Sequence, residues 1–473
     1  MLDMQRLDSS NSNFSDKFAE IKHNKRSLAN PEVAEAVSKI IEQLRDGGNN
    51  SLLELTNRYD GSEYKALEEL TFNKDDFATA HQSLAPEMAK YLLEINQRIS
   101  DYHSRQVQHS WFEQLSASNM WGQKIVPLNR VGVYAPGGKA AYPSSVLMGC
   151  IPARIAEVPQ VIVTSPRVTA DSASGQLILA AAYIGGADKL YAVGGAQAVA
   201  AMALGSTDIP KVDKIVGPGN SYVTEAKRQL VGEVGIDSLA GPSELVIVAD
   251  KSAPPAWIAA DMLAQAEHAA DTKVLLFAAD AELLDKVEME IDKQLPMQQR
   301  QDIIAKSLND FAVLLKTKDI QEAVQLADSL APEHLQLMVE NPMGHKDMIK
   351  QAAAVFCGIH TSTVYGDYGA GPNHILPTGD AARFSSPLGV SDFTKRISFL
   401  SMDDKMVQKL TPATAEIATA EGFPAHANAA KIRVNQAVDG SDGSDGSDKE
   451  HDDDGKNARE NNSENTSVKD GED

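Results

Sequence analysis

The amino-acid sequence predicts an α/β protein with two related domains, each built on a parallel-rich sheet, and three observations lead to this prediction. The chain has 473 residues, which is too long for one ordinary core. From residue 130 onward, short β-branched segments alternate with helix-length segments, the pattern of a parallel sheet covered on both faces. The alternation begins again at residue 245, so we expect a second unit related to the first, both of them Rossmann-like.

The segment before the alternating part, residues 30–128, is expected to be helical. Apolar side chains recur there at helical spacing, as at Val33, Val37 and Ile40, which is typical of an amphipathic helix. Pro31 suits the first position of that helix because its φ is already close to the helical value.

The two alternating stretches contain the expected strands and helices of the sheets. In the first, strands are expected at residues 131–135, 161–165, 190–193 and 214–216, with helices at 145–156, around 176–184, from 196 and after 220. In the second, strands are expected at residues 245–250, 274–278, 311–315 and 335–339, with a helix at 255–270 and more helix after 278. The short segment at 391–438 is expected to be helical and to pack against another part of the molecule or another subunit.

These elements divide the chain into five expected parts. They are an N-terminal arm (1–32), a discontinuous first α/β domain (33–133 with 246–388), a second α/β domain (134–245), a small helical C-terminal domain (389–438) and a disordered acidic tail (439–473). The tail has no aromatic residue and holds 13 acidic against 4 basic residues, so it cannot bury enough apolar surface to fold. The small helical N- and C-terminal segments are expected to form a dimer contact.

Composition and charge disfavour several classes of protein. No stretch reaches the ~18 apolar residues of a membrane span, and the first residues lack the pattern of a targeting segment, so we expect a cytoplasmic protein with no membrane partner. The net charge of −22 disfavours a nucleic-acid partner, because phosphate binding needs a basic stripe. The two cysteines, Cys150 and Cys357, are far apart, which disfavours disulfides and a cysteine zinc site; Cys150 is expected to be a buried, inert thiol.

Glycine-rich turns follow three of the expected strands and open helices, at residues 136–138, 194–197 and 217–220. Glycine there lets backbone amides approach a phosphate, and the helix N-terminus favours an anion. None of the turns matches the GxGxxG fingerprint, and each alone is more often a tight turn than a phosphate cradle. Because open sheets bind ligands at the carboxyl ends of their strands, three such turns at one end favour a ligand site there.

Two short motifs offer groups for metal binding and proton transfer. Gln265 and His268 lie three residues apart on an expected helix, so they share one face at ~5–6 Å. A surface glutamine and a capping or core histidine explain this pair equally well. Glu333 and His334 follow Pro332 and combine a carboxylate with a base that titrates near neutral pH, although a solvated pair is the commoner explanation.

Two further segments contain candidate ligands. Glycine and proline residues at 366–378 mark an ordered loop, in which Asp367 and His374 offer an oxygen and a nitrogen to a metal or substrate. A tight surface turn with an aspartate cap is the alternative. Glu421 and His426 lie near the end of the last helical segment, where nothing in the local sequence distinguishes His426.

Taken together, these segments resemble the histidinol dehydrogenase family over residues 26–437. The matching segments are RVGVYAPGG, YPSSVLM, VGGAQAVAA, PKVDKIVGPGN, VTEAKR, AGPSE, QAEH, PEHL, GDYGAGPNHILPT, ARFSSPLGV, AHANA and RVN. The resemblance implies a homodimer with active sites shared between the subunits and one zinc ion per subunit. It also implies oxidation of L-histidinol to L-histidine through the aldehyde with two NAD molecules, the last step of histidine biosynthesis.

The resemblance further implies roles for individual residues. The implied zinc ligands are Gln265, His268, Asp367 and His426, the last supplied by the partner subunit. The implied proton acceptors are Glu333 and His334. The implied substrate contacts are Ser243, Glu421, His334 and the zinc ligands, with His374 at the edge of the substrate. The implied NAD contacts are Tyr134, Gln197 and Asn220, which makes residues 134–245 the expected NAD-binding domain.

One position departs from the family pattern: Thr363 stands where many members carry a glutamate, four residues before the metal aspartate. The departure leaves room for a zinc- and NAD-dependent dehydrogenase of the same fold that acts on another small alcohol, such as sulfopropanediol. A non-catalytic zinc-binding paralogue and a zinc hydrolase are also candidates. Ser243 and Glu421 favour histidinol, the pair Glu333 and His334 favours an enzyme over a binding protein, and a hydrolase leaves the glycine turns unexplained.

Overall fold

The computed structural model describes residues 2–23, 30–116, 118–137 and 141–435, so the acidic tail expected at 439–473 lies outside the described residues. The chain divides into two compact units. The larger unit holds Met1–Trp111 and Gln123–Ser398, and the smaller unit holds Phe112–Gly122 and Phe399–Asp473. No described helix is long and apolar enough to cross a membrane.

The larger unit contains two six-stranded sheets, and the first, here named the β5 sheet, has the strand order β2-β7-β6-β5-β8-β9. Its strands are β2 (Thr71–Phe72), β5 (Arg130–Tyr134), β6 (Gln160–Thr164), β7 (Lys189–Tyr191), β8 (Lys214–Val216) and β9 (Gly235–Ile236). The neighbours are parallel except β2, which is antiparallel to β7. Counted from β5, the order is 3-2-1-4-5, which is that of a Rossmann-type sheet.

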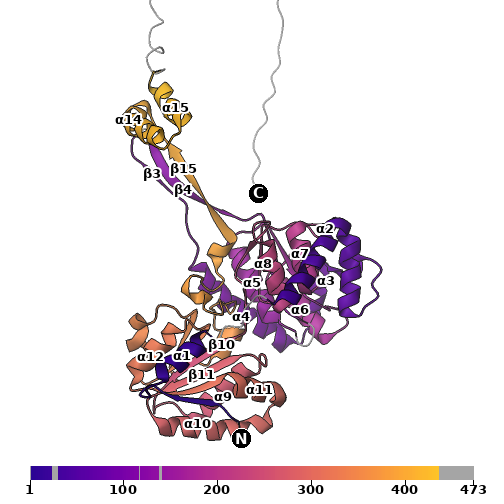
Figure 1. Ribbon diagram of the computed structural model, residues 1–473. Coiled ribbons are helices and arrows are strands. Elements are labelled where there is room, and N and C mark those ends of the chain that lie inside the picture. Colours follow the sequence, from indigo (N-terminus) through magenta and orange to yellow (C-terminus); the bar gives the residue numbers. More distant parts are fainter. Residues whose placement is uncertain (1, 24–29, 117, 138–140, 436–473) are drawn as a thin grey trace, which may run out of the picture. The chain divides into compact units, whose positions relative to one another are not determined.

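Two helical layers cover the β5 sheet (Figure 1). One layer consists of α2 (Pro31–Asp60), α7 (Gly195–Leu204) and α8 (Ser221–Leu230). The other consists of α3 (Lys74–Ser83), α4 (Pro86–Ser104), α5 (Pro143–Ile155) and α6 (Ala173–Ile184). This packing corrects the expected domain division: residues 31–104 belong with the β5 sheet and not with residues 246–388, because α2 covers α7 and α8 and β2 pairs with β7. Likewise β5 itself, placed before the boundary at residue 134, belongs to this sheet.

The second sheet, here named the β10 sheet, repeats the same order with an added edge strand, β1-β12-β11-β10-β13-β14. Its strands are β1 (Gln5–Asp8), β10 (Glu244–Ala249), β11 (Lys273–Ala278), β12 (Ala312–Lys316), β13 (His334–Met338) and β14 (Ala354–Cys357), all parallel. Counted from β10, the order is again 3-2-1-4-5. The prediction of two related α/β units is confirmed, and the expected N-terminal arm supplies β1.

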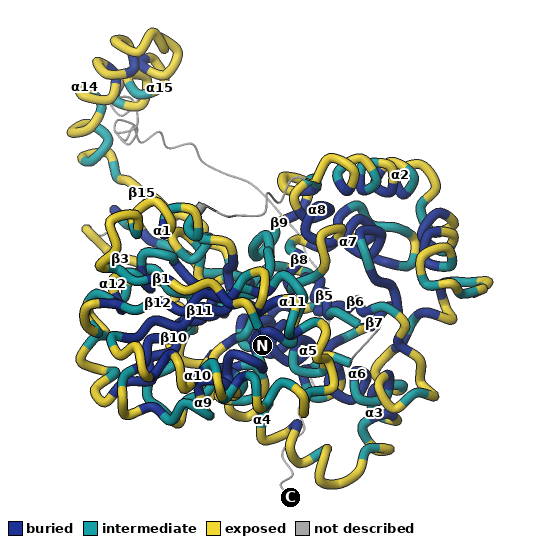
Figure 2. The backbone as a smooth tube through the Cα atoms, turned by 60° about the horizontal axis from the view of Figure 1, so that its bottom comes forward, coloured by how far each residue is buried: buried dark blue, intermediate teal, exposed yellow. Residues whose placement is uncertain are grey.

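The β10 sheet is also buried on both faces. On one face its side chains form a core with α9 (Pro255–Ala266), α10 (Ala281–Gln294) and α11 (Gln301–Phe311). On the other face they pack against α1 (Phe14–His23) and α12 (Ile320–Ser329). Because both faces are covered, the inner strands β10, β11 and β12 are near-continuous apolar runs in the sequence and are mostly dark in Figure 2.

A separate three-stranded sheet corrects the expectation that residues 30–128 and 391–438 are helical throughout. The sheet has the order β15-β4-β3, formed by β3 (Trp111–Gln114), β4 (Met120–Pro127) and β15 (Thr394–Ser401). Most residues of these strands are at least partly exposed, so no burial pattern distinguishes them in the sequence. In the smaller unit α14 (Asp404–Ala420) packs against α15 (Pro424–Asn435), as the sequence predicts for this end.

The remaining regular elements are short. They are α13 (Thr363–Tyr368) and 3-10 helices at Leu67–Leu70, Leu295–Met297, Pro342–Met348, Ala381–Arg383 and Val390–Phe393. Of these, α13 matters most for the site, because it packs against α9 and carries Asp367.

Candidate active site

A cavity of about 540 Å³ opens at the carboxyl ends of the β5 sheet. It is lined by residues that follow β5, β6, β7 and β8, and the three NAD candidates Tyr134, Gln197 and Asn220 are among them. The three glycine turns therefore meet at one end of one sheet, as the sequence predicts, although Gly138 lies outside the described residues.

Local backbone geometry positions these side chains. Asn220 caps α8, and its side-chain oxygen accepts hydrogen bonds from the N–H groups of Tyr222 at 3.0 Å and Val223 at 3.1 Å. Gly195, with a φ of 68°, donates its N–H to the Tyr134 hydroxyl at 3.1 Å. Burial raises the pKa of Tyr134, so its phenol remains a neutral hydrogen-bonding group.

A buried ion pair fixes the turn after β8. Lys227 Nζ lies 2.6 Å from Asp237 Oδ1 and donates to the Gly217 carbonyl oxygen at 2.6 Å, while the Gly217 N–H donates to Asp237 Oδ2 at 2.7 Å. Gly217 has a φ of 109°, and a Cβ there would lie 2.0 Å from the carbonyl oxygen of Tyr134. Only glycine fits this position, and the ion pair ties the turn both to α8 and to the end of β9.

We expect Lys227→Met to lower the free energy of unfolding by about 3–5 kcal/mol, because it leaves the buried Asp237 carboxylate without its countercharge. The two side chains are 3% and 6% exposed. Urea unfolding followed by circular dichroism measures the change. Lys39→Met is the matched control, because Lys39 pairs with Glu35 on the exposed side of α2 and its loss should leave the unfolding midpoint nearly unchanged. Equal midpoints for the two variants would contradict the structural role of Lys227.

The two expected proton acceptors lie at the amino ends of the strands of the β10 sheet. In the β5 sheet, by contrast, the cavity lies at the carboxyl ends of the strands. Glu333 directly precedes β13, and His334 is the first residue of that strand. Both side chains bond to the backbone of Glu244, which begins β10: its N–H donates to Glu333 Oε2 at 2.9 Å, and its carbonyl oxygen accepts from His334 Nδ1 at 3.1 Å. His334 Nδ1 also lies 3.5 Å from Glu333 Oε2. The two adjacent residues therefore serve one site.

The electrostatic environment of His334 favours a proton on its ring. Burial lowers the pKa of His334, but the charge and hydrogen bond of Glu333 and the charge of Asp367 outweigh burial and raise that pKa to about 9. Because a carbonyl oxygen only accepts, Nδ1 carries the proton of the neutral ring, and Nε2 is the basic nitrogen.

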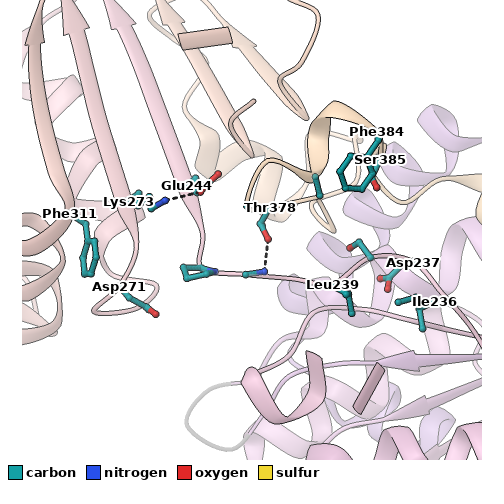
Figure 3. A pocket seen from close by; sticks show the side chains of 15 residues that line it. Ile236, Asp237, Leu239, Glu244, Asp271, Lys273, Phe311, Thr378, Phe384 and Ser385 are labelled. Atoms are coloured by element: carbon teal, nitrogen blue, oxygen red, sulfur yellow. Dashed lines mark hydrogen bonds and ion pairs between the residues drawn. The ribbon is translucent and has the colours of Figure 1, made fainter. Parts of the chain in front are cut away.

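A second cavity, of about 410 Å³, lies beside Glu244 (Figure 3). Ile236 from β9 and Lys273 from β11 both line it, so here the carboxyl edge of the β5 sheet faces the amino edge of the β10 sheet. Lys273 Nζ lies 3.5 Å from Glu244 Oε1, and the two residues are register partners. Burial raises the pKa of Glu244 and the Lys273 charge opposes this. Neither residue was selected from the sequence. The available signal was that each is a charged residue directly before an apolar run.

The loop after α13 joins the two sheets through His374. Its Nδ1 donates to the Asp367 carbonyl oxygen at 2.6 Å, so Nε2 accepts from Ser145 Oγ, in the first turn of α5, at 3.2 Å. Burial lowers the pKa of His374, which keeps the ring neutral. The Asp367 carboxylate acts electrostatically on both His334 and His374. Glu333, His334, Asp367 and His374 therefore form one cluster.

Gln265 lies in α9, which packs against α13, and His268 lies just after that helix. Asp261 of α9 accepts hydrogen bonds from Gln336 Nε2 at 2.6 Å and from the Ser362 hydroxyl at 2.7 Å, and Ser362 caps α13. Gln265, in the last turn of α9, is 2% exposed, and its amide nitrogen has no hydrogen-bond partner among the described atoms. His268 follows in the next turn and is exposed. A buried N–H donor of this kind has room for a water molecule or another acceptor that the polypeptide does not supply.

The remaining expected site residues come from both units. Ser243 directly precedes β10, and its carbonyl oxygen accepts from the Lys273 N–H at 3.0 Å. Glu421 follows α14 and His426 lies in the first turn of α15, both exposed in the smaller unit. Among the described residues, no three His, Cys, Asp or Glu side chains gather as a metal site. Cys150 is fully buried, and burial raises the pKa of its thiol to about 12, which confirms an inert side chain.

Comparisons with known proteins show which family the chain resembles along its length. A profile described as histidinol dehydrogenase matches residues 23–434. The histidinol dehydrogenase of Pseudomonas putida is 44% identical over 408 residues, which covers 86% of this chain and 92% of that protein. The one from Cupriavidus pinatubonensis is 42% identical over 443 residues, 92% of this chain and 98% of that protein.

A solved structure supports the same assignment. The crystal structure of histidinol dehydrogenase from Elizabethkingia anophelis matches with a TM-score of 0.85 and 29% identity, covering 92% of this chain and 99% of that chain. The family profile spans most of the chain, and the relatives match along nearly their whole length, so the resemblance read from the motifs is confirmed. The chain belongs to the histidinol dehydrogenase family.

Proposed function

We propose that this protein is a histidinol dehydrogenase that oxidises L-histidinol to L-histidine through the aldehyde, with NAD as oxidant and a zinc ion in each site. The observation that carries the proposal is the pair Glu333 and His334, held by the N–H and the carbonyl oxygen of Glu244 at the junction of the two sheets. The family of the chain indicates the reaction, the oxidation of histidinol, and this pair can accept the protons that the reaction releases.

The cavity at the carboxyl ends of the β5 sheet is the proposed NAD site. Its position is where open α/β sheets bind nucleotides, and Tyr134, Gln197 and Asn220 line it. Helix α8 begins at the cavity, and the positive end of its dipole favours a phosphate there. The chain between β9 and β10 leads directly from this sheet to Ser243 and Glu244, next to the proposed proton acceptors.

The donor set fits a zinc ion. Gln265, His268 and Asp367 offer nitrogen and oxygen donors from α9, the segment directly after it and α13, and α9 packs against α13. Gln265 would bind through its amide oxygen, and a flip of the amide places that oxygen at the position that has no hydrogen-bond partner. We propose these three residues as ligands, with His426 of a second subunit as the fourth. A bound zinc ion would supply Lewis acidity toward the amino alcohol.

The residues of the chain can perform the proton transfers. His334 Nε2 accepts the hydroxyl proton as hydride leaves for NAD, while Nδ1 stays bonded to the Glu244 carbonyl group. The Glu333 carboxylate, 3.5 Å from the ring, stabilises the charged imidazole and can accept a proton from the water that attacks the aldehyde in the second oxidation. Ser243 and Glu421 are the proposed contacts to the substrate, and His374 lies at its edge.

The smaller unit supports the proposal of a homodimer with shared sites. Its buried apolar residues among those described are few, Ala415, Ala418 and Ala427. Its exposed large apolar side chains are Phe112, Leu115, Trp121, Phe399, Leu400, Met402, Leu410, Ile417, Phe423 and Ile432. A face of this kind is suited to cover by another copy of the chain. Glu421 and His426 lie on the same helical pair and would enter the partner's site with it.

We expect the purified protein to form about two NADH per histidinol consumed, and to lose this activity on chelation and regain it with zinc. Absorbance at the NADH band measures turnover, and metal analysis measures zinc; Gln265→Ala should reduce both. Sulfopropanediol is the comparison substrate, because Thr363 departs from the family pattern. Turnover of the diol without turnover of histidinol in zinc-loaded protein would replace the proposed substrate.

A further inference from the structure

One wall of the proposed NAD cavity carries an ion pair that the proposed reaction does not use. Asp60, the last residue of α2, and Arg167, in the turn after β6, both line the cavity. Arg167 Nε lies 3.2 Å from Asp60 Oδ1, and a second guanidinium nitrogen donates to the Tyr59 carbonyl oxygen at 3.4 Å. The pair joins α2 to the sheet at the cavity.

The pair lies where Rossmann-type sheets recognise the ribose of a dinucleotide. Counted from β5, β6 is the second strand, and residues after the second strand of a Rossmann-type sheet read the 2′ position of the adenosine ribose. An acidic residue there binds the 2′-hydroxyl of NAD, whereas a nearby arginine accommodates the 2′-phosphate of NADP. In this chain Arg167 follows β6, and the acidic residue that pairs with it, Asp60, comes from α2.

The geometry of both residues is specific. Arg167 has a φ of 57°, a left-handed conformation that few side chains adopt and that marks a constrained position. The Asp60 side chain is 13% exposed and that of Arg167 is 55% exposed. Asp60 is also close enough to the Tyr134 hydroxyl for its charge to act on that group. The carboxylate therefore faces the cavity wall, and the guanidinium remains partly open to solvent.

We propose that Asp60 determines the preference of this protein for NAD over NADP. The Asp60 carboxylate forms an ion pair with Arg167, so the guanidinium is not free to bind a 2′-phosphate. The same carboxylate can accept a hydrogen bond from the 2′-hydroxyl of NAD. A 2′-phosphate brings about −1.5 to −2 charges at pH 7 next to this carboxylate, and the repulsion disfavours NADP. The inference rests on the proposed function only in placing the adenosine half of the cofactor in this cavity.

The test compares kcat/KM for NAD and for NADP in four proteins. Asp60→Ser should lower the ratio of NAD to NADP efficiency by at least about tenfold, because it removes the repulsion and frees Arg167. Asp60→Ser with Arg167→Ala should lose the gain in NADP use, because no cation then faces the 2′-phosphate. Glu233→Gln, which breaks an exposed pair between Glu233 and Arg45 outside the cavity, should leave the ratio as in the unmodified protein.

Calorimetric titration of NAD and NADP into the same proteins gives a readout that does not depend on turnover. If Asp60→Ser does not fold, Asp60→Asn replaces it, since it removes the charge and keeps the shape. An unchanged NAD to NADP ratio in a folded Asp60 variant, in turnover or in binding, overturns the inference. If the unmodified protein forms no NADH from histidinol but binds NAD with the expected preference, the proposed function fails and the inference stands.

Discussion

His334→Asn is expected to lower kcat for histidinol oxidation by about 10²–10⁴-fold while the fold and zinc content are retained. The imidazole is the proposed acceptor of the hydroxyl proton, and an asparagine has no basic nitrogen to replace it. Its side-chain amide can still donate a hydrogen bond to the Glu244 carbonyl oxygen, so the buried backbone group keeps a partner. NADH formation measures the loss, and the unfolding midpoint and metal analysis verify that the protein is otherwise intact.

The pH dependence of the same reaction gives an independent measurement. A base must be deprotonated to act, and the pKa of His334 is raised to about 9, so kcat/KM of the unmodified protein should rise with pH from 7 toward 9. Glu333→Gln removes the carboxylate that, after the opposing effect of burial, is the largest cause of this raised pKa. The midpoint of its remaining activity should therefore move to lower pH.

The exposed His109 provides a control for both measurements, because it lies outside the site. His109→Asn should retain the activity and the pH profile of the unmodified protein. A His334→Asn protein with nearly full activity would remove His334 from the role of proton acceptor. A rate that does not change between pH 7 and 9 would contradict the electrostatic account, even if the residue proved essential.

Four strands of each sheet could be predicted because these strands are largely buried on two faces, whereas the edge strands β1, β2, β9 and β14 were not predicted. Residues 245–249 are an unbroken apolar run for this physical reason, and helix-length segments separate such runs. Strand alternation of this kind fits few topologies, since parallel strands require crossover connections. The three glycine turns were placed correctly by the same logic, because the carboxyl ends of parallel strands lie at one edge.

Other parts of the molecule lacked such a signal. Strands β3, β4 and β15 lie largely exposed, so periodicity could not separate them from helix. The helices before β5 were assigned to the wrong sheet, because an amphipathic pattern shows that a helix has a buried face but not which surface covers it. The proposed catalytic pair lies at the amino edge of its sheet, whereas the usual rule for open sheets points to the carboxyl edge.

The candidate residues show the same limit at the level of single side chains. Glu333 and His334 were identified by resemblance, yet their common support, the backbone of Glu244, belongs to a strand 89 and 90 positions away. Gln265 was selected by its helical spacing from His268, but the burial of its amide becomes visible only in three dimensions. Sequence patterns report burial and turns, whereas convergence of distant elements on one site is a tertiary property.

His426→Asn and Gln265→Ala are each expected to reduce zinc binding and activity to near background, and their mixture is expected to recover activity. In a heterodimer with shared sites, one site lacks both residues and the other has all four proposed ligands. Random pairing in an equal mixture makes half of the dimers heterodimers, so about a quarter of the sites should be intact. His426 is exposed in the smaller unit, so its removal should leave the fold of the chain unchanged.

The matched control for this experiment is a mixture of Gln265→Ala with Asp367→Ala. Both residues belong to the larger unit, so every site in such a heterodimer lacks one ligand and no activity should return. Subunit exchange is verified by mass spectrometry of tagged chains before activity is compared. If exchange is complete and the mixture of His426→Asn with Gln265→Ala remains inactive, His426 acts within its own subunit, and the shared site must be abandoned. Recovery in that mixture alone, near a quarter of full activity, requires that the fourth ligand crosses the interface.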